Sequence, residues 1–584
     1  MADPLALLTD RLVPAFAAVR DAAGADPAEV PAPPTVRRSD RADFQADGAL
    51  ALAKRLGRNP REVAAEVAAA ADVGDLVATV EIAGPGFLNL TLDDGALAGL
   101  ARAAWSDERL GVGADTSAGP VVVDYSAPNV AKEMHVGHLR STVIGDALVR
   151  VLEHLGRPVV RQNHVGDWGT PFGMLIEHLV EVGEDRAVAE LSVGDLNGFY
   201  RAARASFDTD DGFKDRSRRR VVALQSGDPE TLRLWRVLVD QSTAYFQAVY
   251  DRLGVLLTPD DIVGESAYND ALPAVVADLD GAGLLVTDDG AECVFPPGFT
   301  GRDGEPQPLI VRKGDGGYGY AATDLAALRH RVDTLGARRS LYVVGAPQRD
   351  HLEMVFAVAR LAGWLPEGVV AEHVPFGNLL GADGKMFKTR SGSSVRLVDL
   401  LDEAVDRAAA AVAERNPDLA GAEAAAVARA VGIGAVKYAD LSSDRVKDYV
   451  LDFDRMLAFE GNTGPYLQYA HTRIRSIFRR GEVDPAALDP AALRLGERPE
   501  RELALALLGF EGAVRATAAT AQPHRLCGYL FDLAQAFTTF YEACPVLRAA
   551  DEGQRASRLV LCDLTARTLA TGLGLLGIEA PPRM

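Results

Sequence analysis

A strand–helix–strand run between residues 121 and 160 is the feature that most constrains the fold. It opens with three consecutive valines, a pattern typical of a short buried strand. Apolar residues then recur with a spacing near 3.6, which predicts an amphipathic helix, at Leu139, Val143, Ala147, Val151 and Leu155. Gly156 ends that helix, and Val159 and Val160 begin a second strand. Because two parallel strands need a crossover connection, the run predicts a Rossmann-like parallel sheet.

The sequence on either side of this run predicts two other kinds of domain. The N-terminal part is typical of a small α+β domain, with a helix at 5–18 and a hairpin formed by 77–82 and 87–92. The C-terminal part is almost entirely helical, with Ala-rich segments and few β-branched runs. We therefore expect three regions, 1–112, 113–400 with a helical insertion at about 180–260, and 401–584.

Composition places the chain among ordinary globular proteins. Of its 584 residues, 48% are hydrophobic and 24% are charged, the balance of a soluble globular protein rather than a disordered or collagen-like one. The formal net charge of −21 argues against non-specific binding to polyanions, although it leaves room for a basic face on one domain. The basic run at 214–220 is better explained as a solvated helix face than as a binding patch.

The sequence argues against export, a membrane span and a disulfide framework. No stretch approaches the roughly 18 consecutive apolar residues that a membrane span needs. Asp3, Asp10 and Arg11 interrupt the segment that would be apolar in a signal peptide, so we expect a cytoplasmic protein. The four cysteines show no CxxC spacing, which favours buried thiols over disulfides or a zinc site.

The first candidate site is the segment His135-Val136-Gly137-His138, at the junction of the first strand and its helix. In open parallel sheets, ligands bind at the carboxyl ends of the strands, where a helix N-terminus offers free N–H groups to phosphate. The two histidines could donate hydrogen bonds to phosphate oxygens, and Gly137 would allow close approach of a nucleotide. Taken alone, the segment is also compatible with two ordinary histidines at a helix start or with part of a metal site.

The second candidate site is a cationic, Gly-flanked loop at 384–392, which carries Lys385 and Lys388. Mobile lysines on such a loop could hold the leaving pyrophosphate and neutralise charge in a transition state. Taken alone, a solvated surface loop is the commoner explanation.

Together these two segments are the paired signatures of class I aminoacyl-tRNA synthetases. Four longer segments sharpen the resemblance, namely DYSAPNVAKEMHVGHLRST, NHVGDWGTPFG, YVVGAPQRDH and GNTGPYLQYAHTRIR. In this order they resemble the arginyl-tRNA synthetase family, and the similarity extends to the closing GIEAPPRM. The resemblance implies a multidomain α/β protein. Its parts would be a Rossmann-like parallel-sheet catalytic domain, a small N-terminal α+β domain and an all-α C-terminal anticodon-binding bundle.

The resemblance implies an arginine pocket built from the first strand, a helix and a later loop. A guanidinium is planar, permanently charged and presents five donors, so carboxylates and amide oxygens suit it. Tyr320 and Asp324, four residues apart, would share one helix face. A buried Asp324 without a cationic ligand would be costly, and a purely structural role would need an arginine partner. The residues implied for arginine are Asp124, Ser126, Asn129, His138, Tyr320, Asp324 and Gln348.

The resemblance also implies an ATP site that includes both signature segments. ATP would enter as a substrate with Mg²⁺, and no tightly bound metal site of the protein is expected. Phe387 departs from the class pattern, which has serine there, and Lys132 just before the histidine segment is assigned a compensating phosphate role. The implied residues are Lys132, His135, Gly137, His138, His164, Gly166, Asp167, Lys385 and Lys388.

The implied reaction joins L-arginine to its tRNA in two steps. The arginine carboxylate attacks the α-phosphate of ATP to give arginyl-adenylate and pyrophosphate. The 2′-hydroxyl of the tRNA 3′-terminal adenosine then takes the arginyl group. Positioning and electrostatics supply the catalysis, so no covalent nucleophile is needed. Members of the family typically need tRNA even for the first step.

For tRNA(Arg), the resemblance implies contacts from both ends of the chain. Aromatic and cationic side chains interleave in the helical C-terminal part, which suits unstacked anticodon bases and phosphates. The N-terminal segment ADFQADG has Asp47 where the family has asparagine, which weakens a base contact because aspartate lacks the amide donor. At least one of the tyrosines at 466 and 469 is expected in the core. The implied residues are Phe44, Gln45, Tyr466, Gln468, Tyr469, His471, Arg473, Arg475, Arg479 and Arg480.

Three alternatives differ from this expectation. A paralogue charging tRNA for a specialised pathway would have the same pocket, and the sequence does not separate it from an enzyme of bulk translation. A non-catalytic tRNA-binding protein would be expected to have lost some of the signature residues. All of them are present here, namely His135, His138, Lys388 and Asp324. A nicotinamide-dependent oxidoreductase would need GxGxxG in the first turn, where this chain has Met134-His-Val-Gly-His. We therefore expect a monomeric enzyme of the resembled family.

Overall fold

The computed structural model describes residues 3–116, 119–192, 196–301, 304–314, 316–381, 383–387 and 395–584. The chain forms two compact units, and each unit combines separate stretches of the sequence. We call them the terminal unit, made of Met1–Ala114, Tyr466–Gly574 and Glu579–Met584, and the central unit, made of Asp115–Pro465 and Leu575–Ile578.

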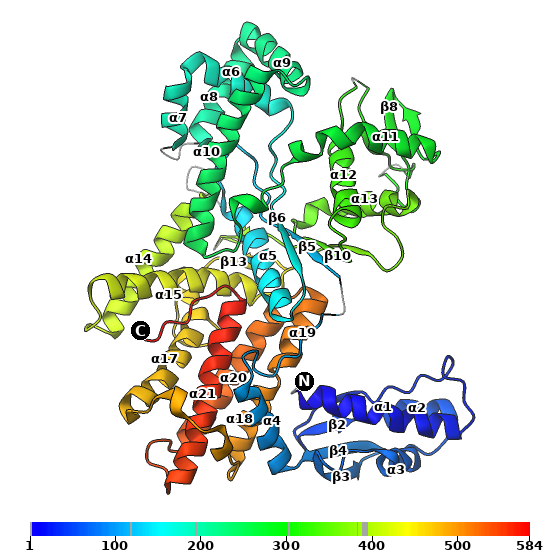
Figure 1. Cartoon of the computed structure of the whole chain (residues 1–584), viewed down its shortest axis with the longest axis vertical. Coiled ribbons are helices and arrows are strands. Elements are labelled where there is room, and N and C mark those ends of the chain that lie inside the picture. The colour runs from blue at the N-terminus through cyan, green and yellow to red at the C-terminus, as the bar shows by residue number, and fades with distance from the viewer. Residues whose placement is uncertain are drawn as a thin grey trace. The chain divides into compact units, whose positions relative to one another are not determined.

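The central unit contains a four-stranded parallel sheet with the order β11-β10-β5-β6 (Figure 1). The strands are β5 (Val121–Asp124), β6 (Val159–Gln162), β10 (Arg339–Tyr342) and β11 (Val370–His373). The helix α5 (Val136–His154) connects β5 to β6, which confirms the strand–helix–strand prediction. Every residue of β5 is buried, as expected of an inner strand covered on both faces.

The register of this sheet aligns the last residues of its strands. Asp124 of β5 lies opposite Gln162 of β6 and Tyr342 of β10, and Tyr342 lies opposite His373 of β11. Ligands bind at the carboxyl ends of the strands in sheets of this kind. The four residues therefore form one polar row at the edge where a site is expected.

A group of helices follows β6, in the region predicted to be a helical insertion. It comprises α6 (Thr170–Val182), α7 (Glu184–Ser192), α8 (Leu196–Thr209), α9 (Asp211–Gln225) and α10 (Pro229–Leu253). The predicted basic run lies on α9, where Arg216 and Arg220 both bind Glu177 of α6. Two members of the run thus hold helices together, while Arg218 and Arg219 are exposed.

A small antiparallel sheet that the sequence analysis did not predict precedes α12. Its strands are β7 (Val286–Asp288), β8 (Ala291–Val294) and β9 (Leu309–Arg312), which are too short to show a clear alternation of polar and apolar residues. The helices α11 (Leu272–Gly281), α12 (Tyr320–Asp333) and α13 (Arg349–Leu361) share one apolar core with this part of the unit.

The helices α14 (Leu397–Arg415) and α15 (Gly421–Leu441) pack against α5, and α16 (Phe453–Met456) packs against α15. Two short strands, β12 (Leu379–Leu380) and β13 (Tyr449–Val450), pair in parallel. Arg140 of α5 donates to Asp440 of α15 at 3.2 Å, and both side chains are buried. The boundary predicted at residue 400 therefore falls inside a compact unit that continues to Pro465.

The segment Leu575–Ile578, near the end of the chain, also belongs to the central unit. Leu576 and Ile578 are buried. Gly577 has a left-handed φ of 66°, and a Cβ on it would lie 2.5 Å from Nζ of Lys437. Glycine is therefore required at this point, where the backbone passes directly beside a buried ammonium group.

The N-terminal part of the terminal unit is an α+β domain, as predicted. Its antiparallel sheet has the order β1-β2-β4-β3, with strands β1 (Val36–Arg38), β2 (Phe44–Ala46), β3 (Val77–Ala83) and β4 (Phe87–Leu92). The strands β3 and β4 confirm the predicted hairpin. Three helices pack against the sheet (Figure 1), namely α1 (Pro4–Ala22), α2 (Gly48–Leu56) and α3 (Pro60–Ala70).

The rest of the terminal unit is helical, which confirms the predicted all-α C-terminal domain. It contains α17 (Gly464–Gly481), α18 (Arg498–Leu508), α19 (Phe510–Thr520), α20 (His524–Ala543) and α21 (Glu552–Leu575). The helix α4 (Asp94–Ser106), which follows the N-terminal sheet, packs against α18. The indole of Trp105 on α4 donates to Asp563 of α21 at 3.0 Å.

One stretch of the described residues, Arg498–Thr520, is long and apolar enough to span a membrane, with a mean hydropathy of 1.3. It forms two helices, α18 and α19, which meet at Gly509, and 56% of its most apolar window is buried inside the protein. Because α18 packs against α4 and α20, burial within the bundle accounts for this composition.

The packing of α5 on β5 can be tested at Gly145. A Cβ on this residue would lie 2.3 Å from Cβ of Tyr125, the first residue after β5. We expect Gly145→Ala to lower the free energy of unfolding by about 1–3 kcal/mol, because the backbone must shift to accept the methyl group. Urea unfolding followed by circular dichroism measures the change.

Gly281→Ala is the control for this prediction. No atom lies within 4 Å of a Cβ built on Gly281, at the end of α11. Its unfolding midpoint should stay unchanged or rise slightly. Equal losses of stability in the two variants would contradict the packing argument.

Candidate active site

An irregular segment connects β5 to α5 at the carboxyl edge of the sheet. Ser126, Ala127 and Ala131 have left-handed φ values of 73°, 47° and 59°, a strained conformation for residues other than glycine. Buried side chains hold this conformation. The N–H of Ser126 donates to Ser141 Oγ at 2.8 Å, and the N–H of Ala127 donates to Asn163 Oδ1 at 2.9 Å. Strain of this kind is concentrated at functional sites.

His135 and His138 lie at the N-terminus of α5, with ring centres 4.0 Å apart. Nδ1 of His135 accepts the N–H of Gly137 at 3.0 Å, and Nδ1 of His138 accepts the N–H of His135 at 3.1 Å. In the neutral form both rings therefore carry their proton on Nε2, which is left to donate to a ligand.

Both histidines are neutral at pH 7. Burial, followed by the charge of Lys132, lowers the pKa of His135 below its ordinary value. Burial, followed by the neighbouring His135, lowers the pKa of His138 to about 3. The site can therefore donate hydrogen bonds to phosphate oxygens without changing protonation state.

A cavity of about 360 Å³ opens beside the two histidines. Helix α8 contributes to its wall, and Nζ of Lys132 lies 4.5 Å from the ring centre of Tyr200 on that helix. Neutral N–H donors beside several cations suit a polyphosphate. The lining residues are Asn129, Lys132, Glu133, Met134, His135, His138, Asn197, Tyr200, Arg201 and Arg396.

The second predicted phosphate segment, after β6, makes mainly internal contacts. Nδ1 of His164 donates to a backbone carbonyl at 3.1 Å. A Cβ on Gly166 would lie 2.3 Å from Oδ1 of Asn129, so glycine allows the two segments to run side by side. Ser266 binds both carboxylate oxygens of Asp167, through its N–H at 2.9 Å and its hydroxyl at 2.6 Å. These residues shape the site, and their contact with ATP stays a prediction.

Helix α12 carries two of the predicted arginine-binding residues. Tyr320 is its first residue and is 74% exposed. Asp324, one turn further, is half-buried, and its Oδ2 accepts Nε2–H of His351 at 2.6 Å. The hydrogen bond to Asp324 raises the pKa of His351 above its ordinary value. Gln348 is exposed at the turn before α13, the helix that carries His351. A purely structural role of Asp324 would need an arginine partner. Its hydrogen-bond partner is instead a histidine, His351.

Asp124 and Ser126, which were also predicted to bind arginine, have partners inside the protein. Oδ2 of Asp124 accepts Nη2–H of Arg331 at 2.7 Å, and both side chains are buried. Oγ of Ser126 lies 2.8 Å from the hydroxyl of Tyr250 and accepts the hydroxyl of Thr142 at 3.0 Å. Both side chains thus have partners inside the protein, and their predicted contact with arginine stays a prediction.

Of the two loop lysines, Lys385 lies within the described residues and Lys388 lies outside them. The carbonyl of Lys385 accepts the N–H of Gly381 at 2.7 Å, and its N–H donates to Asp383 at 3.1 Å. The side chain of Lys385 is exposed on this turn. Its predicted role toward phosphate stays a prediction.

The two N-terminal residues predicted to contact tRNA are buried in the α+β domain. Phe44 lies beneath Arg38, whose guanidinium carbon is 5.2 Å from the ring centre. The side-chain amide of Gln45 donates to Asn89 at 2.7 Å, and its oxygen accepts Arg37 at 2.7 Å. Both side chains lie beneath a surface that carries Arg37 and Arg38, and their predicted contact with tRNA stays a prediction.

Helix α17 holds two of its predicted tRNA-binding residues in the interior. Gln468 and His471 are buried, and each donates to a carbonyl of the C-terminal tail. The acceptors are Glu579, at 2.7 Å from the amide nitrogen, and Pro581, at 3.2 Å from Nδ1. Both residues hold the tail, and their predicted contact with tRNA stays a prediction.

Other side chains of α17 lie nearer the surface. Tyr469 is 42% exposed, whereas Tyr466 is half-buried with its ring centre 5.8 Å from that of Phe531. Burial, followed by the charges of neighbouring arginines, lowers the pKa of Arg479. Positive charge is therefore concentrated here, and its predicted contact with tRNA stays a prediction. The half-buried or exposed arginines of the helix are Arg473, Arg475, Arg479 and Arg480.

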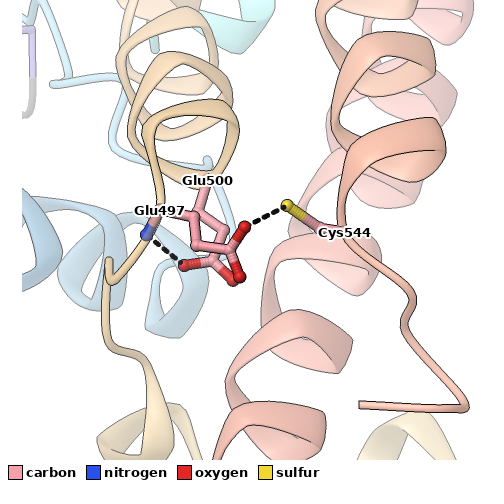
Figure 2. A group of neighbouring side chains, drawn as sticks. All are labelled: Glu497, Glu500 and Cys544. Carbon is pink, nitrogen blue, oxygen red and sulfur yellow. Dashed lines mark hydrogen bonds between the residues drawn. The ribbon is translucent and has the colours of Figure 1, made fainter. Parts of the chain in front are cut away.

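Among the described residues, Glu497, Glu500 and Cys544 have the spacing of metal ligands (Figure 2). The N–H of Glu497 donates to Glu500 at 3.0 Å, and the thiol of Cys544 contacts Glu497 at 3.8 Å. Arg558 already balances the carboxylates, at 2.6 Å from Glu497 and 2.7 Å from Glu500. Burial raises the pKa of Cys544 to about 11, so the thiol stays protonated. All four cysteines are buried free thiols, as predicted.

Four residues that the structure brings to this part of the chain, His351, Arg331, Tyr200 and Arg201, had no role predicted from the sequence. His351 lies three residues after Gln348 in a segment that was recognised, so its position offered a signal. Arg331 follows Asp324 by seven residues on α12, a spacing that places both on one helix face. Tyr200 and Arg201 come from the insertion, and no local pattern links them to the first helix.

Three models of known protein families match the chain, one after another. The arginyl tRNA synthetase N terminal domain matches residues 13–92. The catalytic domain of class I tRNA synthetases (R) matches residues 102–453. The DALR anticodon binding domain matches residues 467–584.

Whole-chain relatives agree with these matches. The chain is 58% identical over 584 residues to the arginine–tRNA ligase of Thermobifida fusca, covering 100% of both chains. It is 51% identical over 569 residues to that of Escherichia coli, covering 97% of this chain and 98% of the relative. The solved arginyl-tRNA synthetase of Plasmodium falciparum superposes with a TM-score of 0.85 at 28% identity, covering 99% of both chains. That of Thermus thermophilus superposes with a TM-score of 0.80 at 27% identity, covering 99% and 100%. The chain therefore belongs to the class I arginyl-tRNA synthetase family, with its N-terminal, catalytic and DALR anticodon-binding domains.

Proposed function

We propose that this chain joins L-arginine to tRNA(Arg) in an ATP-dependent reaction. One observation carries the proposal. The start of α5 places two neutral histidines with unused Nε2–H groups beside a cation-lined cavity, while α12 presents a half-buried carboxylate, Asp324. The first part of the site suits a negatively charged polyphosphate, and the second part suits a positively charged guanidinium.

ATP would bind with its phosphates against the N-terminus of α5. The Nε2–H groups of His135 and His138 would donate to phosphate oxygens, and the positive end of the helix dipole would favour the negative charge. Lys132 and Lys385 would add positive charge, with Lys388 as the second lysine of the loop. Mg²⁺ would accompany ATP as part of the substrate, held by the phosphate oxygens, since the cationic side chains of the site suit phosphate and do not ligate a metal ion.

The chemistry requires one anion to attack another. In the first step a carboxylate oxygen of arginine bonds to the α-phosphorus, and the bond to the β-phosphate oxygen breaks, which releases pyrophosphate. Neutral histidines can stabilise the added negative charge by hydrogen bonding, without taking or giving a proton. In the second step the 2′-hydroxyl oxygen of the tRNA adenosine bonds to the arginyl carbonyl carbon, the bond from that carbon to the phosphate oxygen breaks, and AMP leaves with the hydroxyl proton on its phosphate or released to solvent.

Asp324 would bind the guanidinium of the substrate. Its contact with His351 fixes the orientation of the carboxylate. The neighbouring polar groups of Asn129, Tyr320 and Gln348 would satisfy the remaining N–H donors of the guanidinium. The planar guanidinium points its N–H donors in fixed directions, and the acceptors of the site would match them. The ammonium group of lysine would not match these acceptors.

Two surfaces would bind tRNA(Arg). On α17, Tyr469 would stack on an anticodon base, and the arginines at 473, 475, 479 and 480 would bind phosphates. On the N-terminal domain, Arg37 and Arg38 would contact the tRNA above Phe44 and Gln45. The chain would work as a monomer in the cytoplasm.

ATP–pyrophosphate exchange tests the proposed function. Exchange should depend on arginine and should be stimulated by tRNA, while lysine and canavanine measure how strictly the side chain is recognised. Absence of exchange with arginine, both with and without tRNA, would overturn the proposal.

Asp324→Asn tests the proposed contact with the guanidinium. We expect kcat/KM for arginine to fall about 10- to 100-fold, because a charge-assisted hydrogen bond is worth roughly 1.5–3 kcal/mol. The loss should appear in the KM for arginine and should spare the KM for ATP. Asp333→Asn, at the other end of α12 and largely exposed, is the matched control. An equal loss in this control would mean that α12 itself was disturbed.

The contact between His351 and Asp324 predicts a pH dependence. The pKa of His351 lies above its ordinary 6.5 because its hydrogen bond to Asp324 favours the charged form. As the pH falls through this raised pKa, the imidazolium competes with the substrate guanidinium for Asp324. The KM for arginine should therefore rise toward acidic pH and reach its lowest value above the pKa of His351.

His351→Gln provides the check on this pH dependence, since glutamine can still donate to Asp324 but does not titrate. Steady-state exchange across the pH range should give a flatter profile of arginine KM in this variant. The same slope in the variant and the wild-type protein would assign the pH dependence to another group.

A further inference from the structure

A buried ammonium group lies at the C-terminal end of α10, apart from the residues assigned to the substrates. Nζ of Lys437 on α15 donates at 2.9 Å to the carbonyl of Leu253, the last residue of α10. Oδ2 of Asp146 on α5 lies 3.9 Å from Nζ, and both side chains are fully buried. Burial, partly offset by the charge of Asp146, lowers the pKa of Lys437 to about 8, so the group is charged at pH 7. A charge at this depth depends on partners that are held in place.

The same cluster joins the end of α10 to α5. Oδ1 of Asp146 accepts the N–H of Leu256 at 2.7 Å. Arg150, one turn further along α5, donates to Asp146 at 2.8 Å and to the carbonyl of Gly254 at 2.7 Å. The last carbonyls of a helix have no partner within the helix, and here two charged side chains supply one. The end of α10 is therefore fixed by groups from α5 and α15.

Helix α10 also holds the irregular segment that connects β5 to α5. Oγ of Ser242 accepts the N–H of Ala131 at 2.9 Å, and the hydroxyl of Tyr250 lies 2.8 Å from Oγ of Ser126. Ser126 and Ala131 are two of the residues with a left-handed φ. Tyr250 precedes Leu253 by three residues, so it belongs to the last turn of α10. A displacement of that turn would therefore reach the segment that leads to the first signature motif.

The segment Leu575–Ile578 covers this cluster with apolar residues. Leu576 and Ile578 are buried, and Gly577 lies between them. A Cβ on Gly577 would lie 2.5 Å from Nζ of Lys437 and 2.9 Å from Oδ2 of Asp146. The segment has no polar side chain, so it adds no competing partner for the ammonium group. It leaves Nζ room only for its place on the end of α10.

We propose that Lys437 is a positioning residue for the reaction, and that the segment Leu575–Ile578 keeps it on the end of α10. The proposal rests on the proposed function. With its last turn fixed, α10 holds the segment between β5 and α5 in the conformation that presents Lys132 and His135 to ATP. The end of the chain thus contributes to adenylate formation without touching either substrate.

Gly577→Ala tests the role of the segment. The added methyl group would displace Nζ of Lys437. We expect kcat of arginine-dependent ATP–pyrophosphate exchange, measured with tRNA, to fall about 10- to 100-fold, because a misplacement of about 1 Å costs roughly this much. The KM for tRNA should stay the same. Gly574→Ala, three residues earlier, is the matched control, since no atom lies within 4 Å of a Cβ built there. An equal fall of kcat in this control would overturn the proposal.

A double-mutant cycle with Lys437→Met tests the contact itself. Asp146 keeps Arg150 and the N–H of Leu256 as partners in this variant, so its carboxylate is not left unpaired. Lys437→Met should lower kcat and spare the KM for tRNA. Because methionine lacks Nζ, Gly577→Ala should add little in the Lys437→Met background. An equal loss from Gly577→Ala in both backgrounds would mean that strain at the left-handed Gly577 acts alone and would overturn the proposal.

Tyr250→Phe keeps the test valid if Gly577→Ala does not fold. It removes the hydroxyl that joins the last turn of α10 to Ser126 and leaves Lys437 in place. It should lower kcat in the same direction by a smaller factor. An unchanged kcat in Tyr250→Phe and Lys437→Met would overturn the proposal.

Gly572→Ala is the control for general destabilisation. A Cβ on Gly572 of α21 would lie 2.4 Å from Cδ2 of Leu530, within the terminal unit. Thermal unfolding should show a loss of stability, while kcat of exchange should stay the same. A fall of kcat equal to that of Gly577→Ala would assign the effect to destabilisation and overturn the proposal. A wild-type protein without arginine-dependent exchange would instead overturn the proposed function.

Discussion

The register of the parallel sheet is the constraint on which the site depends. It brings the last residues of β5, β6 and β10 into one row, and that row receives the guanidinium of Arg331. A shift of one residue in β5 would move Asp124 to the opposite face of the sheet. Arg331 would then be buried without its counter-ion, which is strongly unfavourable. The strand pairing and the buried ion pair therefore support each other, and both must form before α12 has a fixed position.

The site divides into two parts with opposite electrostatic character. At the start of α5, burial keeps His135 and His138 neutral, and positive charge is supplied from the edge of the cavity by Lys132 and its neighbours. At α12, a carboxylate is held by a histidine and remains half-buried. In the proposed function, this division would direct the polyphosphate and the guanidinium to different ends of the site. It would also hold the positively charged guanidinium away from the phosphates that the substrate carboxylate must approach.

Sequence patterns predicted the elements with strong local signals and missed those that depend on long-range pairing. The helix α5 shows its apolar spacing within a single segment, whereas β1, β2 and β7 have three residues each and become strands only by pairing with others. The same distinction applies to the site. Motifs identified His135 and Asp324, but the partner of Asp124 follows it by more than two hundred residues, and sheet register alone brings the two together. Phe44 and Gln45 were predicted to contact tRNA and are buried in the structure, because a motif gives residue identity and not burial.

The two compact units do not coincide with consecutive pieces of the sequence. A fragment running from Asp115 to Pro465 would contain the whole parallel sheet, yet it would lack Leu576 and Ile578, which are buried in that unit. A fragment of the N-terminal sequence alone would lack the helices against which α4 packs. Domains recognised along the gene are therefore not interchangeable modules here. Inserting, fusing or exchanging a domain at these borders would divide a hydrophobic core. The whole chain is therefore expected to be retained together in evolution.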